Sequence, residues 1–153
     1  MSTYYIKYIT GPHGQTDYPE NNGNLVAFAV GQEKPSIRFK KCDGFFLYET
    51  GHKAGEKTGA KAIYAQGIIS DDQSSFLHLP EFGVGEKWPY AVKVILQTRT
   101  DPLNGVSLEK VREITGARTL QRKGGLLKIT EEQFDVLSSE LKKCLKNKEK
   151  WRK

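Results

Sequence analysis

Cysteine and histidine are scarce in this sequence, with 2 cysteines and 3 histidines among 153 residues. Cys42 and Cys144 lie far apart and lack the spacing of metal ligands, so we expect two reduced thiols in a cytoplasmic protein. The histidines, His13, His52 and His78, fall in three separate expected loops. We therefore predict no metal site and no cofactor.

Long apolar runs are missing as well. Nowhere does the sequence reach the roughly 18 consecutive apolar residues that a membrane-spanning helix needs. Its first residues, MSTYYIKYIT, lack the cationic segment and apolar run of a secretory signal. We expect neither a membrane span nor export by an ordinary signal.

Enzyme signatures are weak. The sequence contains no G-x-S-x-G motif. Asp71 and Asp72 are adjacent at an expected strand end or turn, where their side chains diverge, so solvated turn residues explain them better than a catalytic pair.

The segment from Gly51 to Thr58, GHKAGEKT, is one residue short of a phosphate-binding P-loop. Glu56 stands where that loop needs a glycine, and its charge would oppose an anion. A strand rather than a helix is expected next. We therefore predict a lysine-bearing hairpin tip, which could still touch a phosphate backbone.

Positive charge is the main compositional feature. Lys and Arg number 24 against 18 Asp and Glu, which gives a formal charge of +6. Such a balance favours polyanionic partners through counterion release, although it also serves solubility alone. The length fits one domain, expected over residues 1–146, with a basic tail at 147–153 that we expect to fray.

Several short segments are typical of strands. These are Tyr4 to Ile9, Leu25 to Val30, FFLYET, AIYAQGIIS and YAVKVIL. FFLYET and AIYAQGIIS are expected to form an antiparallel pair around a long exposed loop. In YAVKVIL the alternation predicts a core-facing side with Val92, Val94 and Leu96.

Two helices are predicted from their caps. Ser107 as N-cap and Gly116 as terminator bound a helix of about two turns. Thr130 and Gln133 form a capping box that opens a longer helix, whose apolar stripe includes Phe134, Leu137, Leu141 and Cys144 or Leu145. Five or six strands with these helices predict an α+β fold, in which a strongly bent mixed sheet approaches a small barrel.

Aromatic and basic side chains could recognise nucleic acid. Trp88, between Lys87 and Pro89, is the best stacking candidate, and its alternative is a core or rim tryptophan. Tyr48 and Phe28 are the next stacking candidates, and the alternative is that they are ordinary core aromatics.

The segment from Gly116 to Lys128 is an expected basic loop between the helices. Arg118, Arg122 and Lys123 surround a double glycine there and could clamp phosphates. A solvated loop with no ligand is the competing interpretation.

The order of these segments resembles the EVE domains of the PUA-like group, which is related to YTH and ASCH domains. The resemblance rests on YYIKYI, NLVAFAV, IRFKKCDGFFLYE, AQGIIS, WPYAVKVIL and RTLQRKGGLLKITEEQFDVL in that order. It covers nearly the whole chain. It implies a small barrel that binds a base flipped out of nucleic acid.

The resemblance also implies where the site lies. A base pocket is expected between the strand that ends near Tyr48 and Thr50 and the segment at Trp88, with Ala27 and Phe28 as another wall. The tryptophan that the family often has in this early run is absent. Phosphate or backbone contacts are expected from Lys41, Lys53, Lys87, Arg118, Arg122 and Lys123.

We therefore predict a non-enzymatic module that binds RNA or DNA through one flipped or unpaired base, modified or not. Two alternatives stay open. One is a small enzyme that acts on a nucleotide or small molecule in the same pocket, and the other is a protein-interaction domain that uses the basic helix.

Overall fold

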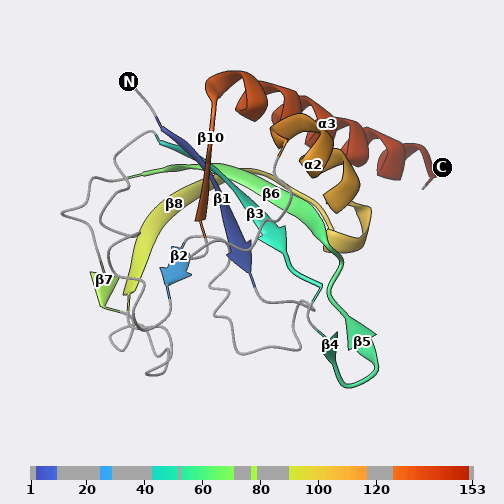
Figure 1. Ribbon diagram of the computed structural model, residues 1–153, viewed down its shortest axis with the longest axis horizontal. Helices are drawn as coiled ribbons and strands as arrows, with labels where there is room; N and C mark the ends of the chain where they lie inside the picture. Colours follow the sequence, from blue (N-terminus) through green and yellow to red (C-terminus); the bar gives the residue numbers. More distant parts are fainter. Residues whose placement is uncertain are drawn as a thin grey trace.

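In the computed structural model the chain forms a curved β-sheet with helices against one of its faces (Figure 1). The structure describes residues 3–9, 25–28, 43–51, 53–70, 77–78, 90–116 and 126–151. The strands are β1 (Tyr4–Ile9), β2 (Leu25–Phe28), β3 (Gly44–Glu49), β4 (Lys53–Ala54), β5 (Lys57–Thr58), β6 (Ala62–Ile69), β7 (Leu77–His78), β8 (Tyr90–Arg99), β9 (Val106–Ser107) and β10 (Leu126–Ile129). The helices are η3 (Pro102–Asn104), α2 (Leu108–Thr115) and α3 (Glu131–Trp151).

The main sheet is mixed. Its strand order is β10-β1-β3-β6-β8-β2, with β7 paired to β8 and β9 paired to β6. β1 and β3 run parallel, whereas the other pairings described in this sheet are antiparallel. Within the described residues no pairing joins the outer strands β10 and β2, so the bent sheet does not close into a barrel. The predicted α+β fold is confirmed.

The sheet carries a core on each face. We call the face against α2 and α3 the helix face, and the opposite one the inner face. The helix-face core includes Ile6, Tyr8, Phe46, Tyr48, Ile63, Val111, Leu137 and Leu141. The inner-face core includes Tyr5, Ile9, Phe45, Leu47, Tyr64, Ala65, Ile69 and Val94. Because successive strand residues alternate between faces, β1 and β3 are apolar at almost every position.

The strand predictions are largely confirmed. β3 and β6 form the expected antiparallel pair, and the loop between them contains the small β4–β5 hairpin. β8 continues to Arg99, past the predicted end. As the alternation predicts, Val94 is buried and Leu96 packs on the inner-face core, whereas Ile95 is 52% exposed.

Both predicted helix starts are confirmed. The hydroxyl of Ser107 accepts from the Lys110 N–H at 3.3 Å, and Gly116 ends α2 in the left-handed region at φ 71°. At α3 the Thr130 N–H donates to Gln133 Oε1 at 2.9 Å, while the Gln133 N–H donates to the Thr130 hydroxyl at 3.1 Å. These reciprocal bonds satisfy N–H groups that a helix leaves unpaired at its start.

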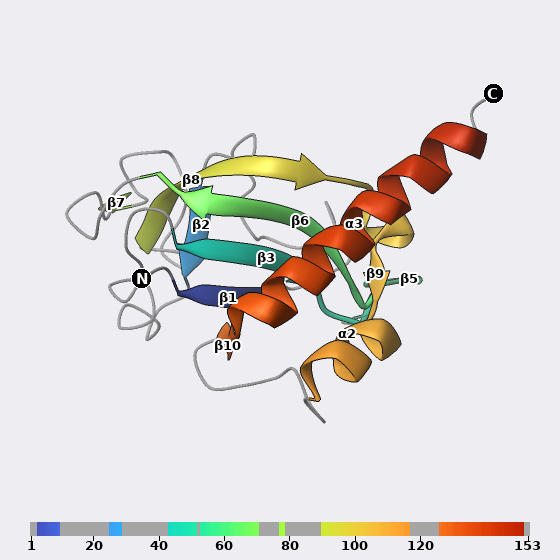
Figure 2. The same ribbon diagram turned by 90° about the horizontal axis from the view of Figure 1, so that it is seen from above.

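α3 packs diagonally across the helix face, and its C-terminal end extends past the sheet (Figure 2). Leu137 and Leu141 are fully buried, and the centroids of the Phe134 and Phe46 rings lie 4.8 Å apart. Gly44 permits this close approach, because a Cβ there would lie 2.8 Å from the Phe134 ring and 2.7 Å from Tyr4 Cδ1. The stripe at helical spacing therefore docks α3.

Two segments differ from their predicted form. The expected loop from Gly116 to Lys128 ends early, because Leu126–Ile129 pairs with β1 as β10. The tail predicted to fray is helical as far as Trp151, where α3 ends. Among the helices of the described residues, none combines the length and apolar character that a membrane span requires.

Candidate nucleic-acid interface

The sequence-predicted pocket residues divide into two groups in the fold. Ala27 and Phe28 lie in β2, where they pair with Ala91 and Tyr90 of β8. This pairing brings them to the strand that follows Trp88, which itself lies outside the described residues. Tyr48 and Thr50 lie instead where β3 ends, and the register places Tyr90 toward the end of the sheet where β3 begins.

Tyr48 points to the helix face. It is 4% exposed, and its ring meets that of Tyr8 edge-on with centroids 5.9 Å apart. Burial raises the pKa of the Tyr48 hydroxyl, an effect that Arg112 partly opposes. The ring is therefore a core side chain, as one interpretation of the sequence allowed, and its part in a base pocket stays a prediction.

Thr50 ties the ends of two strands together. Its N–H donates to the Ile9 carbonyl at 2.9 Å, and the residue is partly exposed just after β3. The bond extends the parallel β1–β3 pairing by one residue. Thr50 is thus placed where a ligand at this end of the sheet could reach it.

Of the predicted phosphate contacts, Lys53 is the one within the described residues, in β4. Lys41, Lys87, Arg118, Arg122 and Lys123 lie outside them. β4 and β5 form a hairpin that projects from the sheet end, with Gly55 at φ 65° in its turn (Figure 1). The prediction of a hairpin tip in place of a P-loop is confirmed, because a strand follows where a P-loop requires a helix.

Lys61 closes the base of this hairpin. It adopts φ 52°, a region that side-chain-bearing residues rarely occupy, and its aliphatic stem lies over Gly51, where a Cβ would collide with it. Its carbonyl accepts from the Leu108 N–H at 2.9 Å. The ammonium of this exposed residue therefore lies at the sheet end from which the hairpin projects.

Two buried ionisable side chains were missed by the sequence analysis. Lys7 is 2% exposed, and burial lowers the pKa of its amine to about 8. Its Nζ donates to the Tyr8 carbonyl at 3.4 Å. Glu49 is 3% exposed, and its Oε2 accepts from the Ala60 N–H at 2.7 Å. The sequence signal was present: each is a charged residue inside an otherwise apolar strand.

Metal and thiol chemistry find no support in the described part of the chain. It contains no cluster of three or more His, Cys, Asp or Glu side chains that could hold an ion. Burial, assisted by Glu140, raises the pKa of the Cys144 thiol, which disfavours the reactive thiolate.

An exposed cation lies beside the inner-face core. The guanidinium of Arg99 is 5.6 Å from the centroid of the buried Tyr64 ring, within the range of a cation–π contact. Arg99 pairs with Ala65, which belongs to the inner-face core. This side of the sheet therefore combines aromatic rings with positive charge.

In sequence, no protein-family model and no curated protein matches this chain. Solved structures do match its fold. The NMR structure of Rpa0253 from Rhodopseudomonas palustris is 12% identical, with a TM-score of 0.54, over 91% of this chain and 92% of the other. The crystal structure of Atu2648 from Agrobacterium tumefaciens is 12% identical, with a TM-score of 0.50, over 89% and 90%.

A further match is human THYN1, crystallised in complex with DNA that contains 5-methylcytosine. It is 14% identical, with a TM-score of 0.54, over 91% of this chain and 98% of THYN1. Similarity at such low identity establishes the fold and nothing finer. The described part of the chain has a PUA-like α+β fold.

Proposed function

We propose that this protein is a non-enzymatic nucleic-acid-binding module of the EVE type that recognises one flipped or unpaired base, modified or not. The observation that carries the proposal is the fold shared with human THYN1, which was crystallised with 5-methylcytosine-containing DNA. The sequence-level resemblance to EVE domains points the same way. We further propose that the protein acts in the cytoplasm.

Charge supports a polyanionic partner. The formal charge is +6, and Lys57 and Lys61 are exposed on and beside the β4–β5 hairpin. Lysines in such positions neutralise phosphates without reading the sequence. The predicted phosphate contacts are Lys41, Lys53, Lys87, Arg118, Arg122 and Lys123.

Base recognition requires more than charge. Extruding a base costs a few kcal/mol, whereas stacking it on an aromatic ring returns about 1–3 kcal/mol. In the proposed pocket Trp88 supplies this ring, and Ala27 and Phe28, on the strand paired with the one that follows it, form a wall. Thr50, where β3 ends, would contact the nucleotide from the other end of the sheet. Tyr48, whose ring packs on the helix face, anchors the end of β3 two residues before Thr50.

A panel of oligonucleotides tests the proposal. Single- and double-stranded DNA and RNA, with and without a modified base, are titrated at low and high salt. We expect binding that weakens as salt rises and that prefers strands with an unpaired base. Absence of binding to every strand at low salt would show that the proposal is wrong.

A further inference from the structure

Lys7 and Glu49 face the same side of the sheet. They lie on the neighbouring parallel strands β1 and β3, where Lys7 pairs with Leu47 and Ile9 pairs with Glu49. Ile9 and Leu47 belong to the inner-face core, so strand alternation places Lys7 and Glu49 on that face too. One strand across and two residues along corresponds to roughly 8 Å between their Cα atoms.

Glu49 has one oxygen whose hydrogen bonding is incomplete. Oε2 accepts from Ala60, but the buried Oε1 has no hydrogen-bond partner among the described residues. A buried carboxylate oxygen that gives up water without gaining a donor is costly, so native structures rarely leave one in this state. An ionised carboxylate can only accept hydrogen bonds. The missing group is therefore an N–H or O–H donor.

Lys7 supplies the complementary chemistry. Burial lowers the pKa of its amine to about 8, so the amine is still largely protonated at pH 7. An ammonium group carries three N–H donors and no acceptor. A ligand that meets both residues must present a donor toward Glu49 and an acceptor toward Lys7.

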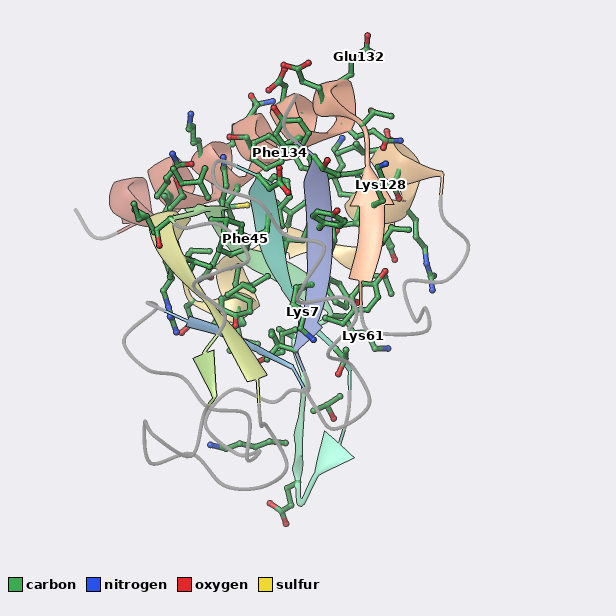
Figure 3. The ribbon with its side chains drawn as sticks, turned by 90° about the vertical axis from the view of Figure 1, so that its left-hand side faces the viewer. Lys7, Phe45, Lys61, Lys128, Glu132 and Phe134 are labelled. Carbon is green, nitrogen blue, oxygen red and sulfur yellow. The ribbon has the colours of Figure 1, made fainter. Side chains whose placement is uncertain are left out.

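The position of the pair suits a nucleotide. Figure 3 shows Lys7 and Lys61 at the same end of the sheet, away from α3. The Glu49 carboxylate holds Ala60, next to Lys61, at the base of the β4–β5 hairpin. Exposed Lys57 and Lys61 can contact phosphates there. Lys7 and Glu49 are themselves only 2% and 3% exposed, so a base that meets them must enter the inner face.

We infer that Glu49 accepts a hydrogen bond from the exocyclic amino group of the bound base, while Lys7 donates to the adjacent ring nitrogen or carbonyl oxygen. This rests on the proposed nucleic-acid function. Cytosine, adenine and guanine carry such an amino group beside an acceptor, and acidic side chains pair with the N4 amino group of cytosine. Held in the same orientation, uracil and thymine turn O4 toward the carboxylate. They can meet the pair only by shifting so that their N3–H faces Glu49 and O4 or O2 faces Lys7, so we expect them to bind more weakly.

Cytosine and uracil are nearly the same shape, which makes them the sharpest comparison. Two oligo-dT strands, one with a single dC and one with dU at the same position, are titrated by fluorescence anisotropy. We expect the wild-type protein to bind the dC strand about tenfold more tightly or better. N4,N4-dimethylcytosine, which has no amino hydrogen, should bind no more tightly than dU.

Glu49→Gln tests the residue itself. Its amide oxygen can still accept from Ala60, but the other end becomes an NH2 donor, which suits the uracil O4 atom. We expect the preference for dC to disappear or reverse. Glu56→Gln, the same charge change on the exposed hairpin tip, should leave the preference unchanged.

The outcomes separate the two proposals. If the wild-type protein binds none of these strands, the proposed nucleic-acid function fails, and this inference fails with it. If it binds dC, dU and dimethylcytosine strands equally, or if Glu49→Gln keeps the wild-type preference, the role of Glu49 is refuted while nucleic-acid binding stands. The dimethylcytosine strand gives this answer on the wild-type protein, even if Glu49→Gln does not fold.

Discussion

The backbone N–H of Ala60 donates to Oε2 of Glu49 at 2.7 Å, across the base of the β4–β5 hairpin. This bond joins the end of β3 to the segment that leads into β6. It fixes the hairpin relative to the sheet. The other oxygen of the same carboxylate, Oε1, is buried and has no hydrogen-bond partner among the described residues. One side chain therefore couples the hairpin, with its lysines, to the inner face.

Removing the carboxylate should loosen the hairpin. Glu49→Ala leaves the Ala60 N–H without its acceptor, so this amide should exchange with deuterium much faster, and stability should fall by about 1–3 kcal/mol. Glu49→Gln keeps an acceptor and serves as the control. Equal protection of Ala60 in the wild-type protein and in Glu49→Ala would mean that this bond does not hold the hairpin.

The burial of Lys7 should destabilise the protein less as the pH rises through the mildly alkaline range. The pKa of its amine is about 8 in the folded state, against 10.5 for a lysine in water, so between these values the unfolded chain binds more protons than the folded one. The unfolding free energy therefore rises with pH across that window, by about 2–3 kcal/mol, as the penalty for burying the charged amine is relieved.

Lys7→Met should remove this dependence. The variant keeps a long side chain without a charge to desolvate, so its unfolding free energy at pH 7 should exceed that of the wild-type protein by a similar amount. Urea unfolding of both proteins at pH 7 and pH 10 measures the difference, and the other titrating groups cancel in the comparison. A gap between the two that does not change with pH would contradict the account.

The start of α3 should depend on its capping box. Thr130→Ala removes the hydroxyl that accepts from Gln133, at a cost of about 1 kcal/mol, which lowers Tm by roughly 2–4 °C for a chain of this size. Ser139→Ala, at an exposed position inside the same helix, is the control and should change little. Thermal unfolding that finds the two variants alike would refute the role of the cap.

Trp88 and Arg122 should affect binding differently. If Trp88 stacks on the base, Trp88→Ala should reduce discrimination between strands with and without an unpaired base more than it reduces general affinity. Arg122→Ala should weaken all strands alike and make the salt dependence shallower by about one phosphate contact. The reverse pattern would reject these roles.

Local features of the fold could be predicted because their signals are local. Ser107, Gly116, Thr130 and Gln133 mark helix ends through contacts within about one helical turn, so their caps can be recognised in the sequence. The β4–β5 hairpin follows from its glycines for the same reason.

Long-range features could not be predicted in this way. β3 is buried on both faces, so no alternation shows that Tyr48 points toward the helices and Glu49 away from them. The parallel pairing of β1 with β3 joins segments far apart in sequence, and it is this register that places Lys7 near Glu49. The sequence indicated the kind of ligand, but the inner-face pair emerged only from the fold.

The salt dependence of binding to a single-stranded oligonucleotide tests the central claim most directly. The logarithm of the wild-type affinity is measured against the logarithm of salt concentration. The account predicts measurable binding at low salt and a negative slope that corresponds to several phosphate contacts. No binding at low salt, or an affinity that salt does not change, would contradict it.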